Sequence, residues 1–185
     1  MIKEKSKILF LLSHQPNPRF SKQIKFLSSF FSIDLIYFSR NQLWAYPPEI
    51  DEFLRKSIDL VSIPSGRYLK RAILYCLMLF KLSRHLRINK YEIVIVNNID
   101  TLCLFTLARF FSARKINSNT IKVIQISDLR EFFFSKGVMS KLLRWINAKT
   151  VLLANKLVVT SEKFLNFYHH AFDSSNTFTL LNKPL

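Results

Sequence analysis

The sequence contains very little glycine, since Gly66 and Gly137 are the only two among 185 residues. A phosphate-binding loop of the P-loop or dinucleotide-binding type needs several neighbouring positions without a Cβ, so that the backbone can approach the phosphates. Two isolated glycines cannot form such a loop. The sequence therefore excludes the nucleotide-binding classes that depend on one.

Cysteine and histidine are also scarce, with two and four residues. Cys76 and Cys103 lie in the apolar stretches LYCLML and TLCLFT. We expect both to be buried hydrophobic side chains rather than a disulfide or a metal pair. The sequence has no CxxC, and His169 and His170 are too close together for the usual i, i+4 zinc ligands. We therefore expect no metal site and no cofactor bound by this chain alone.

Long hydrophobic runs are missing as well. The longest, residues 72–80, is roughly half of what a transmembrane helix needs. The apolar run 8–12 is too short for a signal peptide, because charged and turn-forming residues follow it at once. We expect a cytoplasmic protein that does not cross a membrane, with peripheral attachment to the inner face of the plasma membrane as an open alternative.

Acidic residues are outnumbered, with 12 Asp and Glu against 28 Lys and Arg, which gives a formal net charge of +16. This excess has three interpretations: a solvated basic surface, attraction to an anionic membrane or a phosphate-bearing substrate, and binding of nucleic acid. No nucleic-acid recognition motif accompanies the charge. We therefore expect no nucleic-acid partner.

Short apolar runs alternate with longer helical patterns along the chain, and 49% of the residues are hydrophobic. This alternation predicts βαβ units in a mostly parallel sheet with helices on both faces, a Rossmann-like α/β fold. The length suits a single domain over 1–185. The predicted strands are 7–13, 33–39, 57–64, 91–98, 121–127, 156–160 and 177–181. The first predicted helix starts near Pro18 and has Ile24, Phe26, Leu27, Phe30 and Phe31 on its apolar face. Further helices are predicted over 67–88, 101–111 and 138–155, and a last one after Ser161.

Ligands bind to such sheets at the carboxyl ends of the strands, so the segments that follow strands are the places to inspect. They read SHQPNPR, NNIDT, SDLRE and TSEKF. In this order they resemble the N-terminal domain of family-4 glycosyltransferases, which have the GT-B fold. KILFLLSHQPNPR is similar to the first βαβ unit, YEIVIVNNIDTL to a strand ending in H-x-x-D, and VIQISDL to the segment vYD-x-HD-l. NKLVVTSEKF is similar to aD-x-vi-t-vSe, and TLLNKP to the strand and turn that end the domain.

The resemblance covers nearly the whole chain and implies the acceptor-side half of a GT-B enzyme, with 182–185 at the start of the linker between domains. It implies transfer of a sugar from a nucleotide-sugar to a sugar or lipid-linked acceptor, in bacterial-type synthesis of cell-surface polysaccharide or glycolipid. A nucleotide-sugar donor is expected only with a second domain, and the isolated chain is expected to be inactive. The alternative is a non-catalytic half-enzyme that binds a membrane or a partner glycosyltransferase, including a separate donor-domain protein.

Two side chains follow the first strand. Arg19 lies at a helix start, where a guanidinium beside free backbone N–H groups suits a phosphate or an acidic sugar. A solvated surface arginine is the alternative. His14 is a candidate contact for a ligand hydroxyl, or a loop histidine without a particular role.

Later strands bring further candidates. Asn98 and Asp100 suit hydrogen bonding to sugar hydroxyls, although Asp100 also suits a helix cap. Three charged residues follow the strand that ends at 127, and among them a carboxylate could orient a sugar or act as general base; they are Asp128, Arg130 and Glu131. Asp128 is the candidate catalytic residue. Ser161 and Glu162 are either ligand contacts or an N-cap with a favourable first-turn carboxylate.

The chain departs from the family pattern at one segment. Counting back from Asp128, the usual His of the family falls on Ser127, its Asp on Gln125 and its Tyr on Ile124. If that His supports catalysis by contacting the donor sugar, Ser127 puts this support in doubt, although some family members carry a small residue there. This departure favours the non-catalytic alternative.

Two basic helices complete the sequence-based candidates. Lys70 and Arg71 lie at one end of an apolar helix, and Arg144 and Trp145 share a second helix with several leucines. A basic helix with an aromatic anchor can lie in a lipid interface, so these four residues are candidates to face a membrane. The alternative is that one helix is buried beneath the sheet and the other has a solvated face.

Overall fold

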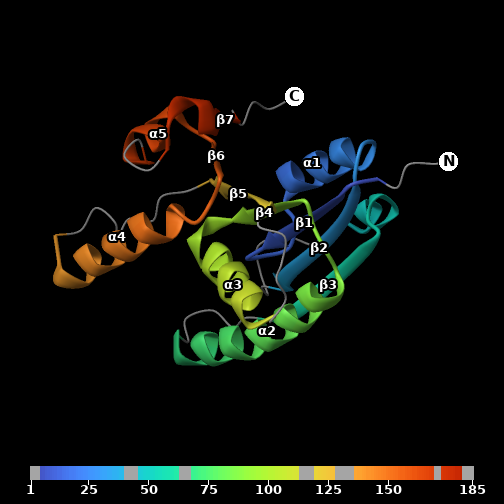
Figure 1. The fold of residues 1–185 in the computed structure, drawn as a ribbon, viewed down its shortest axis with the longest axis horizontal. Coiled ribbons are helices and arrows are strands. Elements are labelled where there is room, and N and C mark those ends of the chain that lie inside the picture. The colour runs from blue at the N-terminus through green and yellow to red at the C-terminus, as the bar shows by residue number, and fades with distance from the viewer. Residues whose placement is uncertain are drawn as a thin grey trace.

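The chain folds around a seven-stranded sheet, in which every neighbouring pair of strands is parallel and the strand order is β3-β2-β1-β4-β5-β6-β7 (Figure 1). The computed structural model describes residues 5–39, 46–62, 68–112, 119–127, 136–168 and 172–180. The strands are β1 (Lys7–Leu12), β2 (Ser32–Ser39), β3 (Lys56–Ser62), β4 (Ile93–Asn97), β5 (Ile121–Ile126), β6 (Lys156–Val159) and β7 (Thr177–Thr179). The predicted Rossmann-like α/β fold is confirmed.

Helices cover both faces of this sheet. Within the described residues they are α1 (Pro18–Ser28), α2 (Tyr68–Ile88), α3 (Asn98–Phe111), α4 (Val138–Val151) and α5 (Glu162–Tyr168), together with the 3-10 turns η1 (Pro48–Phe53) and η3 (Ser174–Asn176). From β1 to β3 the chain moves across the sheet in one direction, and from β4 onward it moves in the other. Because crossovers between parallel strands keep one hand, the two halves place their helices on opposite faces.

Each face has its own hydrophobic core. On one face, α1 and η1 pack on β1 and β2 through Phe20, Ile24 and Ile50. On the other face, α2 and α3 lie side by side across the sheet, and residues of α4 and α5 join the same core (Figure 1). The strand residues of the two cores alternate, as a sheet buried on both faces requires.

Helix α1 begins where its sequence predicts. Asn17 is the N-cap, and its side chain accepts a hydrogen bond of 3.1 Å from the backbone N–H of Phe20, while Pro18 occupies the first turn. Phe20 and Ile24, four residues apart, face the sheet. The prediction that Phe26 and Phe30 share this apolar face is wrong, because 11 residues cover a narrow strip of sheet and both rings point to solvent.

The prediction that both cysteines are buried is also wrong. Cys76 is exposed and Cys103 is half-buried, because apolar residues surround α2 on all sides and Cys76 falls on its outward side. Helix α3 starts at Asn98 rather than Thr101, and α4 ends at Val151 rather than Asn155. Within the described ranges, no helix is long and apolar enough to cross a membrane, and no group of three metal-ligating side chains occurs.

Candidate functional site

Polar side chains gather at the carboxyl ends of β1, β4 and β5. Ser13 and His14 follow β1, Asn97 ends β4, and Ser127 follows β5. The direction of strand order reverses beside β1, and a crevice outside the carboxyl ends at such a reversal is the usual ligand position in an open parallel sheet. The fold therefore places these residues where a ligand is expected.

Asn97 connects the loop after β1 to β4. Its side chain is fully buried, and its Oδ1 accepts a hydrogen bond of 2.6 Å from the Ser13 backbone N–H. Its Nδ2 therefore faces His14 Nε2 as a donor, at 3.2 Å. His14 Nδ1 then donates to the Gln15 carbonyl oxygen, at 2.6 Å. These bonds fix the neutral Nδ1–H form of His14 and hold the loop in place.

Asn98 turns the chain directly from β4 into α3. It has a φ of 70°, in the left-handed region that asparagine tolerates better than most residues. Its Nδ2 donates to Ser13 Oγ at 3.4 Å. A residue held in this conformation between a strand and a helix marks a constrained position of the kind that clusters at binding sites.

Arg19 lies in the first turn of α1 and reaches across to β5. Its Nη2 donates to Ser127 Oγ at 2.7 Å, and its guanidinium carbon lies 5.3 Å from the centre of the Phe20 ring. The Arg19 Nε is buried and has no hydrogen-bond partner among the described residues. Burial lowers the pKa of the Arg19 guanidinium, because the charge is removed from water without a described carboxylate beside it.

Gln125 provides a second unpaired donor at the same edge. It lies opposite Asn97 in the β4–β5 register and is buried, with its Nε2 unpaired among the described residues. Buried N–H groups without a partner are rare in folded proteins, because each costs about 1–3 kcal/mol. One such donor belongs to Arg19, which contacts Ser127 just after β5, and the other belongs to Gln125 near the end of β5. Together they indicate a place where a ligand or water supplies the missing acceptors.

Comparisons with known proteins agree with this architecture. A lipopolysaccharide outer core galactosyltransferase, WaaB, in its apo form matches 96% of this chain and 46% of its own, with a TM-score of 0.64 and 13% identity. A UDP-N-acetylglucosamine 2-epimerase matches 95% of this chain and 48% of its own, with a TM-score of 0.62 and 14% identity. The chain has the Rossmann-like fold of these GT-B proteins. It spans about half of their length. No protein-family model and no curated protein matches the sequence.

Asp100, predicted to bind sugar hydroxyls or to cap α3, lies inside the first turn of the helix. Its Oδ2 accepts a hydrogen bond of 3.0 Å from the Tyr75 hydroxyl, and its Oδ1 accepts one of 3.1 Å from the Thr101 N–H. The N-cap position belongs to Asn97 instead, because the left-handed Asn98 starts the helix earlier. Asp100 therefore joins α2 to the start of α3.

The other predicted residues divide into two groups. Ser161 occupies the N-cap position of α5, where its Oγ accepts from the Lys163 N–H at 3.3 Å, and Glu162 is exposed in the first turn. Three residues lie outside the described part of the chain, so their roles stay predictions: Asp128, Arg130 and Glu131.

The predicted membrane-facing residues divide similarly. Lys70 and Arg71 lie in the first turn of α2, and their side chains are outside the described part of the structure. Trp145 is exposed on α4, and Arg144 is half-buried beside it. The alternative that one basic helix is buried beneath the sheet does not hold for α2, because much of its outward surface is exposed and apolar.

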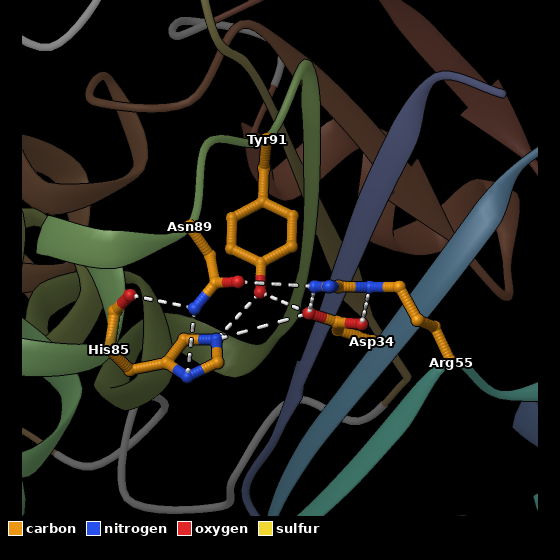
Figure 2. Close-up of polar contacts among 5 residues, drawn as sticks. All are labelled: Asp34, Arg55, His85, Asn89 and Tyr91. Carbon is orange, nitrogen blue, oxygen red and sulfur yellow. Dashed lines mark hydrogen bonds and ion pairs between the residues drawn. The ribbon is translucent and has the colours of Figure 1, made fainter. Parts of the chain in front are cut away.

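A second polar cluster, which the sequence does not predict, lies near the amino ends of the strands (Figure 2). Asp34, near the start of β2, is 1% exposed. It accepts hydrogen bonds from Arg55 through Nε (2.8 Å) and Nη2 and from the Tyr91 hydroxyl, and His85 Nε2 lies 4.0 Å away. Asn89 completes the cluster, because its Oδ1 accepts from Arg55 at 3.3 Å and its Nδ2 faces His85 Nδ1 at 3.5 Å.

This cluster has matching donors and acceptors, which indicates a structural role. Tyr91 donates to Asp34, so its oxygen accepts from His85 Nε2 at 2.6 Å, and the imidazole is neutral. Burial lowers the pKa of His85, and burial together with the Asp34 hydrogen bond raises the pKa of Tyr91. The signal in the sequence is Asp34 itself, a lone acidic residue in the apolar strand IDLIYFS. Its partners are distant in sequence and become visible only in the fold.

Proposed function

We propose that this chain is the acceptor-side half of a glycosyltransferase similar to family 4. It binds a sugar that bears a phosphate or carboxylate group at the carboxyl edge of β1, β4 and β5. The half-buried guanidinium of Arg19 carries this proposal, because its described hydrogen-bond acceptor is the neutral Ser127 hydroxyl and its Nε has none. An anion placed there would accept from Nε and compensate a charge that the protein leaves uncompensated.

The neighbouring groups suit the rest of such a ligand. The Gln125 amide offers a buried donor beside Asn97, and the Ser13 hydroxyl lies at the same strand ends. Amide and hydroxyl groups are typical partners of sugar hydroxyls. His14 holds the loop in place, because its two ring nitrogens already contact Asn97 and Gln15. The similarity in fold to a galactosyltransferase supports a sugar as the ligand.

Transfer itself needs a donor sugar and a base. We propose that a second Rossmann-like unit binds the nucleotide-sugar, and that Asp128 is the candidate base. The acceptor belongs, in this proposal, to synthesis of a cell-surface polysaccharide or glycolipid. Incubation of the purified 185-residue chain with nucleotide-sugars and acceptor should give no turnover without an added donor-side protein. Robust turnover by the chain alone would contradict this proposal.

The ligand site is tested by calorimetric titration with glucose 6-phosphate, glucuronate and glucose. We expect the two anionic sugars to bind more tightly than glucose. Arg19→Met should lower the affinity for the two anionic sugars by about 10- to 100-fold, since a hydrogen bond to a charged group is worth about 1.5–3 kcal/mol. The affinity for glucose should change little.

Arg87→Met is the matched control, because it removes an exposed arginine of α2 and should leave all three affinities unchanged. Circular dichroism of each variant shows whether the fold is intact. Equal affinities of wild-type protein and Arg19→Met for glucose 6-phosphate would refute the proposed site.

The accessory alternative is favoured by one observation. Ser127 occupies the position of the family's usual His, and its hydroxyl accepts from Arg19. If addition of a donor-side protein gives sugar binding without transfer, the chain is a binding half rather than a catalytic one.

A further inference from the structure

Helices α2, α3 and α4 expose several large apolar side chains on the side that faces away from the sheet. On α2 these recur at Ile73, Leu77 and Phe80, a spacing of four and three residues that keeps them in one stripe. Phe80 is 69% exposed, and Phe110 near the end of α3 is 80% exposed. The inward stripe of α2, which includes Met78 and Leu82, already packs on the sheet. The exposed stripe is therefore additional to the core.

The stripe continues along α2 as a basic surface. Arg84 and Arg87 follow Phe80 at the same helical spacing, and both are exposed. Near the end of α4, Trp145 and Lys149 repeat the combination of an exposed aromatic ring and an exposed basic side chain. These helices belong to one core on one face of the sheet, where α2 packs beside α3 and α3 beside α4.

The charge of these three helices is one-sided. They contain nine Lys and Arg residues, five in α2, one in α3 and three in α4. Their one acidic residue, Asp100, accepts hydrogen bonds from Tyr75 and Thr101. On the opposite face, η1 carries Glu49, Asp51 and Glu52, all exposed. These three helices thus carry a strong excess of basic residues, whereas η1 on the opposite face carries exposed acidic ones.

We propose that the outer surface of α2, α3 and α4 binds an anionic lipid bilayer. Exposed aromatic and aliphatic side chains would enter the headgroup region, and the arginines and lysines beside them would contact anionic headgroups. A second copy of this chain is a poorer occupant. An isologous contact would bring two copies of the same basic surface together, and like charges across an interface cost binding energy.

The experiment is sedimentation of the full 185-residue chain with vesicles of phosphatidylcholine alone or with 30% phosphatidylglycerol. We expect strong binding to the anionic vesicles, weak binding to the neutral ones, and a loss of binding at high salt. Arg84→Glu/Arg87→Glu should weaken binding to the anionic vesicles at least about thirtyfold. Phe80→Ser should weaken it about tenfold, because most of the ring is available to enter the interface.

The α1 face provides matched controls. Lys22→Glu/Lys25→Glu changes the net charge as much as the arginine pair does, and Phe26→Ser removes a ring that is 68% exposed against 69% for Phe80. Both control variants should bind anionic vesicles within about threefold of the wild-type protein, because their side chains lie on the other face. These substitutions are at exposed positions, so the fold should survive them.

Three results would overturn the proposal. The first is an absence of vesicle binding by the wild-type chain. The second is an equal loss in the α1-face controls, which would indicate attraction by net charge alone. The third is a wild-type dimer in sedimentation equilibrium that Phe80→Ser abolishes, which would assign the surface to a second copy.

Discussion

Replacement of Asp34 by asparagine tests whether the cluster at the amino edge of the sheet stabilises the fold. The carboxylate is 1% exposed and accepts from Arg55 and Tyr91. Asparagine has the same shape but presents an NH₂ group in place of one oxygen. At least one buried donor then loses its acceptor, and a second donor is added to the cluster.

The expected magnitude follows from the exposure of the partners. The Arg55 side chain is 37% exposed, so water can solvate its charge after the substitution, and the ion pair contributes at most about 1 kcal/mol. The buried Tyr91 hydroxyl cannot reach water as easily, and an unpaired buried donor costs about 1–3 kcal/mol. We expect Asp34→Asn to lower the free energy of unfolding by roughly 2–3 kcal/mol. For a protein of this size the midpoint temperature should fall by roughly 4–12 °C.

The assay is urea unfolding followed by far-UV circular dichroism. Asp59→Asn is the matched control, because Asp59 is an exposed carboxylate on the neighbouring strand that accepts from Ser39. Its effect should stay within about 0.5 kcal/mol. If Asp34→Asn does not fold, Tyr91→Phe replaces it, with an expected loss of about 1–2 kcal/mol. If Asp34→Asn and Asp59→Asn have unfolding free energies that agree within about 0.5 kcal/mol, the reasoning is refuted.

Three further predictions concern other parts of the fold. Burial lowers the pKa of His85, so the contribution of this histidine to stability is complete above about pH 6.5 and declines as pH falls toward the lowered pKa. The wild-type protein should therefore lose unfolding free energy between pH 7.5 and 5.5, and His85→Gln should reduce this loss. Asn98→Ala should destabilise the fold by about 1 kcal/mol and Asn98→Gly by less, because φ is 70° at this residue. Thermal unfolding measures both variants, and equal losses for Ala and Gly would contradict this prediction. Ile24→Ala should cost about 2–5 kcal/mol in urea unfolding, whereas Phe26→Ala should cost less than about 0.5 kcal/mol, because Ile24 is fully buried on the sheet and Phe26 faces solvent.

The order of strands and helices could be predicted from the sequence because local patterns carry it. A buried parallel strand reads as a continuous apolar run, as in residues 93–96, and Pro18 with Asn17 marks a helix start by turn chemistry alone. Which apolar side chains of a helix face solvent could not be predicted to the same extent. Phe26 and Cys76 lie in apolar stretches, and only the width of the sheet beneath each helix decides which apolar residues it covers.

The candidate site could be predicted in part. Arg19 and His14 are visible because they follow a predicted strand, and the fold places them at the reversal point of the sheet. Asn97 and Gln125 were missed as site residues. Each is a polar residue at the end of an apolar strand, which is a readable signal, but only the parallel pairing of β4 with β5 brings them opposite one another.

The two polar clusters of the sheet should respond to substitution in opposite ways. At the amino edge, Asp34 is matched by Arg55 and Tyr91, so a substitution breaks a satisfied network and costs stability. At the carboxyl edge, Arg19 holds a half-buried charge with an unpaired Nε, so its removal relieves desolvation while it loses one hydrogen bond to Ser127. Arg19→Met should therefore change the free energy of unfolding by less than about 1 kcal/mol, while it abolishes most of the affinity for anionic sugars. A loss above about 2 kcal/mol in urea unfolding would show that the guanidinium serves the fold, and no ligand would then be needed to explain its position.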